Sequence, residues 1–248
     1  MHQTVFRRYE LKYMLSASEA ESIICAMAPY MKADKYGKTT VRNLYFDTDS
    51  YRIIRRSIEK PAYKEKLRIR SYGRADSAST VFVELKKKYE KVVYKRRLPL
   101  TEADAMRWVC EREACPVNTQ ISREIDYFIE FYGKPLPKVF LSYDREAYYG
   151  EADADFRVTF DRNILCREND LSLCSEAYGI PILPPDRVLM ELKCAGGIPL
   201  WMTQLLSAGK IYKESFSKYG TAYRELIFPR LYYKNSIKKE TLVNGCNF

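Results

Sequence analysis

The tripeptide Glu-Leu-Lys occurs three times in segments with the alternating polar and apolar pattern of a β-strand, at residues 10–12, 84–86 and 191–193. In an extended strand, side chains two residues apart point to the same face of the sheet. Each copy therefore places a carboxylate and an ammonium group on one face and a leucine on the other. A sheet that collects these strands has one apolar face and one ionic face, and the ionic face must meet water or a ligand.

Further strand-like segments carry mainly basic residues on their polar face. Residues 62–72 place five polar side chains on one face, namely Lys64, Lys66, Arg68, Arg70 and Tyr72. In residues 91–98, Lys95 and Arg97 share a face. Two like charges about 4 Å apart repel by about 1 kcal/mol in water and by about 4 kcal/mol at an effective dielectric constant near 20. Crowding many cations on one face is therefore costly unless an anion binds there.

The alternating segments predict about eight strands, at residues 4–14, 40–47, 62–72, 80–88, 91–98, 137–149, 155–162 and 187–194. Pro99 is expected to end the fifth of these strands, because proline cannot donate a ladder hydrogen bond. Helices are predicted after Ser16, where Glu19 completes a capping-box signature, and within residues 101–132. Two more helical stretches, near residues 199–212 and 214–228, follow the last strand.

These elements predict an α+β fold, an eight-stranded antiparallel β-barrel with helices packed outside. If the helices cover the apolar face, the ionic face turns inward and lines a tunnel that is wide enough for solvent and a ligand. No linker rich in proline, glycine or serine divides the chain. Residues 1–234 are therefore predicted to form a single domain, and residues 235–248 a polar C-terminal tail.

The charge balance is basic, with 42 Lys and Arg against 32 Asp and Glu, which gives a net charge of +10 over 248 residues. Such a balance suits nucleic acid, an anionic membrane surface or a phosphorylated small molecule, and composition alone does not choose among them. A nucleic-acid binder is disfavoured because the basic residues form no RNA-binding aromatic motif and no reading helix. An enclosed wall would also exclude a duplex.

Several classes of protein and of catalysis are disfavoured by what the sequence contains. No apolar run is long enough to span a membrane, and no signal-peptide core follows Met1. The seven cysteines include no CxxC pair, which indicates reduced thiols in a cytoplasmic protein. The one histidine, His2, makes a histidine-based metal site or a histidine general base implausible, and with it the Ser-His-Asp and Cys-His mechanisms.

Nine short stretches, in order along the chain, carry a likeness to a known family. They are residues 8–13 (RYELKY), 44–48 (LYFDT), 66–72 (KLRIRSY), 83–86 (VELK), 94–97 (YKRR), 143–145 (YDR), 156–159 (FRVT), 190–193 (MELK) and 216–219 (FSKY). Together they resemble the VTC (vacuolar transporter chaperone) catalytic domain, the polyphosphate polymerase branch of the triphosphate tunnel metalloenzymes. Each stretch alone is weak, but the ordered set is specific.

The resemblance implies an eight-stranded antiparallel tunnel. It also implies transfer of the terminal phosphate of ATP to a growing inorganic polyphosphate chain, with Mn²⁺ or Mg²⁺. By motif, Arg68, Arg70 and Lys86 are expected to hold the transferred phosphate. The other substrate-binding candidates are Lys12, Lys95, Arg97, Arg145, Arg157, Lys193 and Lys218. The metal candidates are Glu191, Glu84 and Glu10, and for the last two an ion pair with neighbouring lysines is the alternative.

Two positions depart from the family pattern. The wider superfamily opens with Glu-x-Glu-x-Lys, and here Arg8 replaces the first glutamate, as is usual in the polymerase branch. The polymerases also tend to carry a lysine three residues before the position of Lys218, where this chain has Ser215. Arg8 tilts the expectation away from a simple triphosphatase.

Phosphoryl transfer needs positioning and charge neutralisation more than covalent help, which agrees with the lack of histidine in the body of the chain. ATP and inorganic polyphosphate are the expected partners. A long chain would need a channel that is open at both ends. A membrane protein that receives the product is a further possible partner. Two alternatives stay open. One is a triphosphatase that hydrolyses inorganic or nucleoside triphosphate. The other is a non-catalytic module that binds polyphosphate or nucleotide.

Overall fold

The computed structural model describes residues 9–90 and 92–232, which form nine strands and six α-helices. The strands are β1 (Tyr9–Ser16), β2 (Met31–Asp47), β3 (Tyr63–Tyr72), β4 (Thr80–Tyr89), β5 (Val92–Thr101), β6 (Leu136–Gly150), β7 (Arg157–Arg167), β8 (Ile180–Pro181) and β9 (Arg187–Cys194). The helices are α1 (Ala17–Met27), α2 (Arg52–Ile58), α3 (Glu102–Met106), α4 (Gln120–Phe131), α5 (Leu200–Ala208) and α6 (Lys218–Ala222). Two π-helical turns, η1 (Arg107–Glu111) and η2 (Tyr223–Ile227), extend α3 and α6. The predicted tail at 235–248 and the first residues of the predicted strand 4–14 lie outside the described residues.

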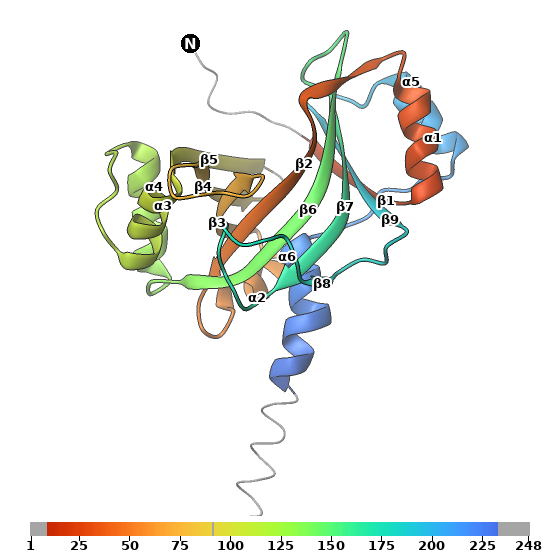
Figure 1. The fold of residues 1–248 in the computed structure, drawn as a ribbon. Coiled ribbons are helices and arrows are strands. Elements are labelled where there is room, and N and C mark those ends of the chain that lie inside the picture. Colours follow the sequence, from red (N-terminus) through yellow and green to blue (C-terminus); the bar gives the residue numbers. More distant parts are fainter. Residues whose placement is uncertain (1–8, 91, 233–248) are drawn as a thin grey trace, which may run out of the picture.

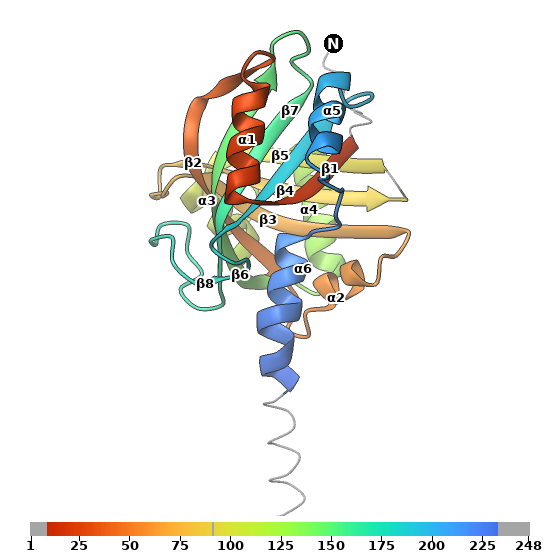
Figure 2. The ribbon, with the colours of Figure 1, turned by 90° about the vertical axis from the view of Figure 1, so that its right-hand side faces the viewer.

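All strands pair antiparallel in one sheet, in the order β1-β9-β7-β6-β2-β3-β4-β5, with the short β8 beside β7. The sheet is strongly coiled, so that β3, β4 and β5 cross the direction of β6, β7 and β9 (Figure 2). The α+β class and the antiparallel pairing are confirmed. The closed eight-stranded barrel is not, because within the described ranges β1 and β5 remain the two edges of the sheet.

The free edge of β1 is occupied by a segment of the chain that follows α5. Tyr13 pairs with Lys213 in an isolated bridge, and the Glu214 N–H donates to the Lys12 carbonyl at 2.8 Å. This segment lies where a closing strand would have to pair with β1. The two ends of the sheet nevertheless approach each other, since Lys86 on β4 contacts Glu10 on β1 at 2.9 Å.

Two of the three apolar clusters lie on the convex face of the sheet. Leu67, Val83 and other residues of β3–β5 pack against Trp108 and Phe128 from the α3–α4 region. At the other end, β1, β7 and β9 pack against α1 and α5 (Figure 1). These helices cover the outside of the sheet, as the sequence predicts.

The third cluster lies on the concave face and corrects the prediction that all helices pack outside. On β2, Asn43 lies between Leu141 of β6 and Arg70 of β3. In the same way, Tyr45 lies between Val139 of β6 and Arg68 of β3. Leu141 and Val139 therefore share a face with the arginines, and they pack there against Tyr219, Ala222, Tyr223 and Ile227 of α6 and η2. One end of the concave face is filled by helix, so the expected channel open at both ends is not supported at this end.

Three strands run well beyond the ranges that the sequence patterns predict, one of them being β7, which ends at Arg167 rather than residue 162. β2 begins at Met31 rather than residue 40, and β5 continues through Pro99 to Thr101. The prediction that Pro99 ends its strand is wrong because β5 is an edge strand, where the position of a missing N–H can face away from the neighbouring strand. By contrast, the capping box of α1 is confirmed: the Glu19 N–H donates to Ser16 Oγ at 3.2 Å, and the Ser16 N–H donates to the Glu19 carboxylate at 2.7 Å.

Candidate functional site

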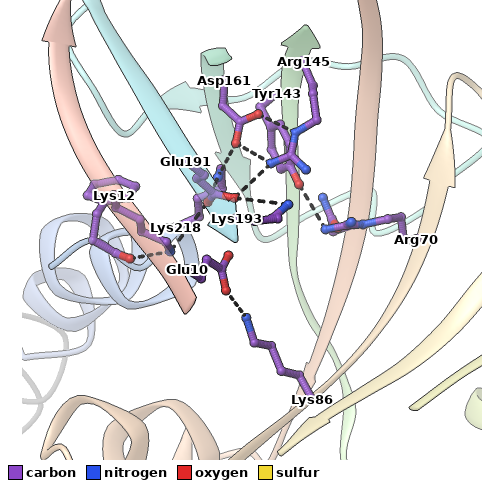
Figure 3. A network of polar contacts seen from close by, with 12 residues as sticks. Glu10, Lys12, Arg70, Lys86, Tyr143, Arg145, Asp161, Glu191, Lys193 and Lys218 are labelled. Atoms are coloured by element: carbon purple, nitrogen blue, oxygen red, sulfur yellow. Dashed lines mark hydrogen bonds and ion pairs between the residues drawn. The ribbon is translucent and has the colours of Figure 1, made fainter. Parts of the chain in front are cut away.

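The concave face away from α6 carries a dense set of charged side chains, which we call the ionic face. Cross-strand pairing builds it: Lys12 lies opposite Glu191, Arg145 opposite Asp161, and Arg68 opposite Glu84. Every residue predicted from the sequence as a site candidate lies on this face. Figure 3 shows part of the set, with Lys218 reaching the face from α6. Arg157, opposite Lys193, is exposed at its rim. The structure thus brings the candidates together, while their roles stay predictions.

Glu84 is the centre of the first cluster. Its carboxylate is 1% exposed and contacts Arg97 Nε at 2.6 Å, Lys95 Nζ at 2.7 Å and Arg68 NH2 at 2.7 Å. Arg70 adds a longer contact at 3.9 Å. Burial alone would raise the pKa of the Glu84 carboxyl, but the four surrounding cations hold it well below its ordinary value. Because its oxygens are already occupied, the geometry favours the ion-pair interpretation of Glu84 over metal binding.

Asp161 and Glu191 form the second cluster, with cations that contact both. Lys218 Nζ lies 2.5 Å from Asp161 and 3.2 Å from Glu191, and Arg145 NH2 lies 2.7 Å from Asp161 and 3.4 Å from Glu191. Burial disfavours the charged carboxylates, yet these cations lower the pKa of both groups. Asp161 is held tightly at 2.5–2.7 Å, whereas the contacts of Glu191, including Lys12 at 3.6 Å and Lys193 at 3.9 Å, are long.

Three uncharged side chains connect or support the clusters, and sequence reasoning did not single them out. The Tyr143 hydroxyl accepts from Arg70 at 3.0 Å, and its ring lies 4.5 Å from Lys218 Nζ. Asn43 accepts from Arg70, and the Tyr45 hydroxyl accepts from Arg68 at 2.9 Å. An uncharged Tyr or Asn is common on any strand face, so their sequence positions alone did not mark them as partners of the arginines.

Glu10 joins the two halves of the ionic face. It pairs with Lys86 and so connects β1, at one edge of the sheet, with β4, near the other edge. Burial and the nearby Glu191 raise its pKa, but Lys86, Lys12 and Lys193 together outweigh both effects, and the pKa of Glu10 falls to about 2. Glu10 is therefore ionised at neutral pH and, like Glu84, is explained by its ion pair.

Metal binding has to be tested against the side chains that are present. Residues 9–90 and 92–232 contain no group of three or more His, Cys, Asp or Glu side chains arranged to hold a metal ion. Glu191 has loosely held oxygens, and the hydroxyl of its cross-strand neighbour Thr159, a residue 5% exposed, has no hydrogen-bond partner. One carboxylate and one hydroxyl fit Mg²⁺ or Mn²⁺ only if phosphate oxygens and water supply the remaining ligands, which is the usual arrangement for Mg²⁺ in phosphoryl-transfer sites.

Comparison with known proteins agrees with this architecture. The family model of the VTC domain matches residues 7–227, nearly the whole chain. The chain belongs to the VTC domain family. A search of curated proteins gave no match.

Among solved structures, this VTC domain is similar to a Bacillus halodurans protein provisionally described as an adenylate cyclase. The TM-score is 0.55 at 15% identity, over 87% of this chain and 96% of that chain. A Vibrio parahaemolyticus protein with the same provisional description gives a TM-score of 0.48 at 10% identity, over 88% of this chain and 98% of that chain. At such identities the first likeness concerns the fold alone.

Two further observations bear on the sequence analysis. In the part of the VTC domain that the structure describes, no helix is long and apolar enough to cross a membrane. The six cysteines in this part are free.

Proposed function

We propose that the protein is a metal-dependent polyphosphate polymerase that transfers the terminal phosphate of ATP to the end of an inorganic polyphosphate chain. The observation that carries the proposal is the ionic face, where cations from β1, β3, β4, β5, β6, β9 and α6 converge around four carboxylates. Arginine forks and lysine ammonium groups are the side chains that bind phosphate oxygens best. Membership of the VTC family supports the same ligand class.

In this proposal, Arg68, Arg70 and Lys86 hold the transferred phosphoryl group. Arg70 is suited to positioning because its guanidinium is fixed by Asn43 and Tyr143. The bond between the terminal phosphorus of ATP and its bridging oxygen breaks, a terminal oxygen of the chain bonds to that phosphorus, and ADP leaves. The chain end is already an anionic nucleophile, so no strong general base is needed.

A divalent metal, held by Glu191 and Thr159, would draw charge from the leaving group. The ionic face performs the remaining tasks, which are to grip the phosphates and to neutralise their charge. A membrane-protein partner that receives the product stays a prediction from the family resemblance.

A triphosphatase is the second candidate, and one observation favours it. Because α6 and η2 fill one end of the concave face, a short triphosphate fits the space more simply than a chain that threads through. In that reaction, water replaces the polyphosphate end as the nucleophile. A non-catalytic module that binds polyphosphate or nucleotide is the remaining alternative.

The test is incubation with ATP and Mn²⁺, followed by gel electrophoresis of the phosphate products. The proposal predicts long chains in the wild type and a loss of at least tenfold in Arg70→Lys, because lysine cannot reproduce the guanidinium fork. Arg96→Lys is the matched control, since Arg96 pairs with Glu124 on the opposite face of the sheet, and its rate should stay within about twofold. Free phosphate alone would favour the triphosphatase, and ligand binding without turnover would favour the binding module.

A further inference from the structure

Lys66 differs from the other lysines of the ionic face in its partners. Lys12, Lys86, Lys95, Lys193 and Lys218 each lie within 4.0 Å of a carboxylate. Lys66 Nζ has no carboxylate partner in the described ranges, and its hydrogen bond goes to Ser217 Oγ at 3.1 Å. Sequence reasoning placed Lys66 on the polar face of its strand but gave it no role, because the lack of a partner becomes visible only in three dimensions.

The surroundings of Lys66 are positive. It lies directly opposite Lys86, which in turn lies opposite Lys95, so that three lysines form a row across β3, β4 and β5. Like charges directly opposite each other destabilise a sheet. Burial, reinforced by the nearby Lys86, Lys12, Lys64 and Arg68, lowers the pKa of Lys66 to about 7. Below about pH 7 the folded protein therefore holds a cation here that no carboxylate of the described residues neutralises.

Ser217 adds a second hydrogen-bond donor at the same place. Its hydroxyl oxygen accepts from Lys66 and from the Gly220 N–H at 3.2 Å, and its own proton remains free to donate. Lys66 Nζ has three protons, of which Ser217 uses one. A phosphate group placed here would receive N–H and O–H donors and would supply the missing negative charge.

We infer that Lys66, together with Ser217, is a phosphate-binding subsite of the ionic face, with an inorganic phosphate chain as its ligand. The inference deepens the proposed function and relies on it for the ligand class. The carboxylate-paired lysines must exchange an existing partner for a phosphate, whereas Lys66 gains a partner it lacks. A phosphate on Lys66 also touches the first turn of α6 and so connects ligand binding to the position of Lys218.

The inference predicts a signature that a structural lysine would not give. Lys66→Met should weaken the binding of tripolyphosphate at least tenfold in EDTA, because a dedicated cation is lost. The same change should leave the Tm of the ligand-free protein equal or higher, because repulsion within the lysine row is relieved. If the lysine had a purely structural role, its substitution would lower both the affinity for tripolyphosphate and the Tm. Lys66→Arg should retain binding.

The experiment is isothermal titration of tripolyphosphate into the full chain in EDTA at pH 6.5, with thermal unfolding of each ligand-free variant. Lys35→Met, at an exposed position of β2, is the control for the loss of one positive charge and should bind within about twofold of the wild type. Lys66→Gln and Ser217→Ala provide independent readings if Lys66→Met does not fold, and each should weaken binding several-fold.

The inference is wrong if Lys66→Met or Lys66→Gln binds tripolyphosphate with an affinity within twofold of the wild type. It is also wrong if the wild-type protein does not bind tripolyphosphate. Failure of the proposed function has a different signature. In that case the wild type binds tripolyphosphate and the Lys66 variants bind it weakly, yet ATP and Mn²⁺ yield no long chains.

Discussion

At the scale of single residues, the two buried carboxylates of the second cluster differ in how tightly their cations hold them. Asp161, which is fully buried, has short contacts with Arg145 and Lys218, and this arrangement is that of a structural ion pair. Glu191 has longer contacts with the same two cations and an unpaired hydroxyl beside it. A carboxylate that its neighbours hold loosely can exchange them for a metal at little cost.

Glu191→Gln keeps the volume of the side chain but removes its charge. We expect the metal-dependent turnover to fall at least 100-fold, while the affinity for tripolyphosphate in EDTA stays equal or increases, because the face becomes more positive. Turnover of ATP at increasing Mn²⁺ concentrations measures the first effect, and titration calorimetry of tripolyphosphate in EDTA measures the second. Glu146→Gln on the convex side of β6 is the control. A full response to Mn²⁺ in Glu191→Gln would rule out a metal role for this residue.

The lysines of the ionic face make stability depend on pH. In the folded state the pKa of Lys66 falls from 10.5 to about 7, and those of Lys95 and Lys193 fall to about 8, mainly through burial. The folded protein thus binds these protons less tightly than the unfolded chain does. The folded protein therefore pays a free-energy penalty for keeping these lysines protonated. This penalty is fully present below pH 7 and is relieved as the pH rises toward 10.5.

We therefore expect the free energy of unfolding of the ligand-free protein to rise between pH 7 and pH 9. Lys66 contributes on the order of 1 kcal/mol per pH unit where it responds fully, and Lys95, whose side chain is 44% exposed, contributes less because solvent screens its charge. The carboxylates that face these lysines have lowered pKa values and stay ionised in this window. Urea unfolding at pH 7, 8 and 9 measures the slope, which should be smaller in Lys66→Met. Equal slopes would contradict the assignment of Lys66 as an uncompensated cation.

At the scale of elements, the strands were predictable because alternation on one ionic and one apolar face is a local signal. The last strand, 187–194, agrees with β9 residue for residue, and the helical pattern predicted to start at residue 101 does so, with Thr101 as the cap of α3. The path of β5 through Pro99 depends on its edge position, which no local pattern reveals. The placement of α6 on the concave face was also out of reach, because it depends on the Tyr219 hydroxyl reaching buried Asp47, 172 residues away.

α6 is held at the ionic face by Lys218, which is 9% exposed. Lys218→Met leaves Asp161 and Glu191 buried with fewer cations, and breaking a buried pair in this way costs about 3–5 kcal/mol. Urea unfolding should report this loss. The exposed Lys213, just upstream, is the control, and Lys213→Met should change stability by no more than about 0.5 kcal/mol. A loss below 1 kcal/mol in Lys218→Met would mean that α6 is held by its apolar contacts alone.

At the scale of the whole molecule, the sheet gathers its cations on one coiled surface without closing. The sequence predicted which residues share this surface, because same-face placement follows from the strand period alone. It could not predict whether the edges meet, since closure depends on strand tilt and on the segment around Lys213 that occupies the edge of β1. The cations of the ionic face outnumber its four carboxylates, so this concave surface carries a positive field of the sign that attracts phosphate.

The central claim is that this concave ionic surface binds a phosphoanhydride chain. A crystal structure of the protein with tripolyphosphate tests it most directly. The account predicts phosphate density against Arg68, Arg70 and Lys86, with a terminal phosphate on Lys66 and Ser217. Phosphate found only on the convex surface, with the ion pairs of Glu84 and Glu191 unchanged, would contradict it.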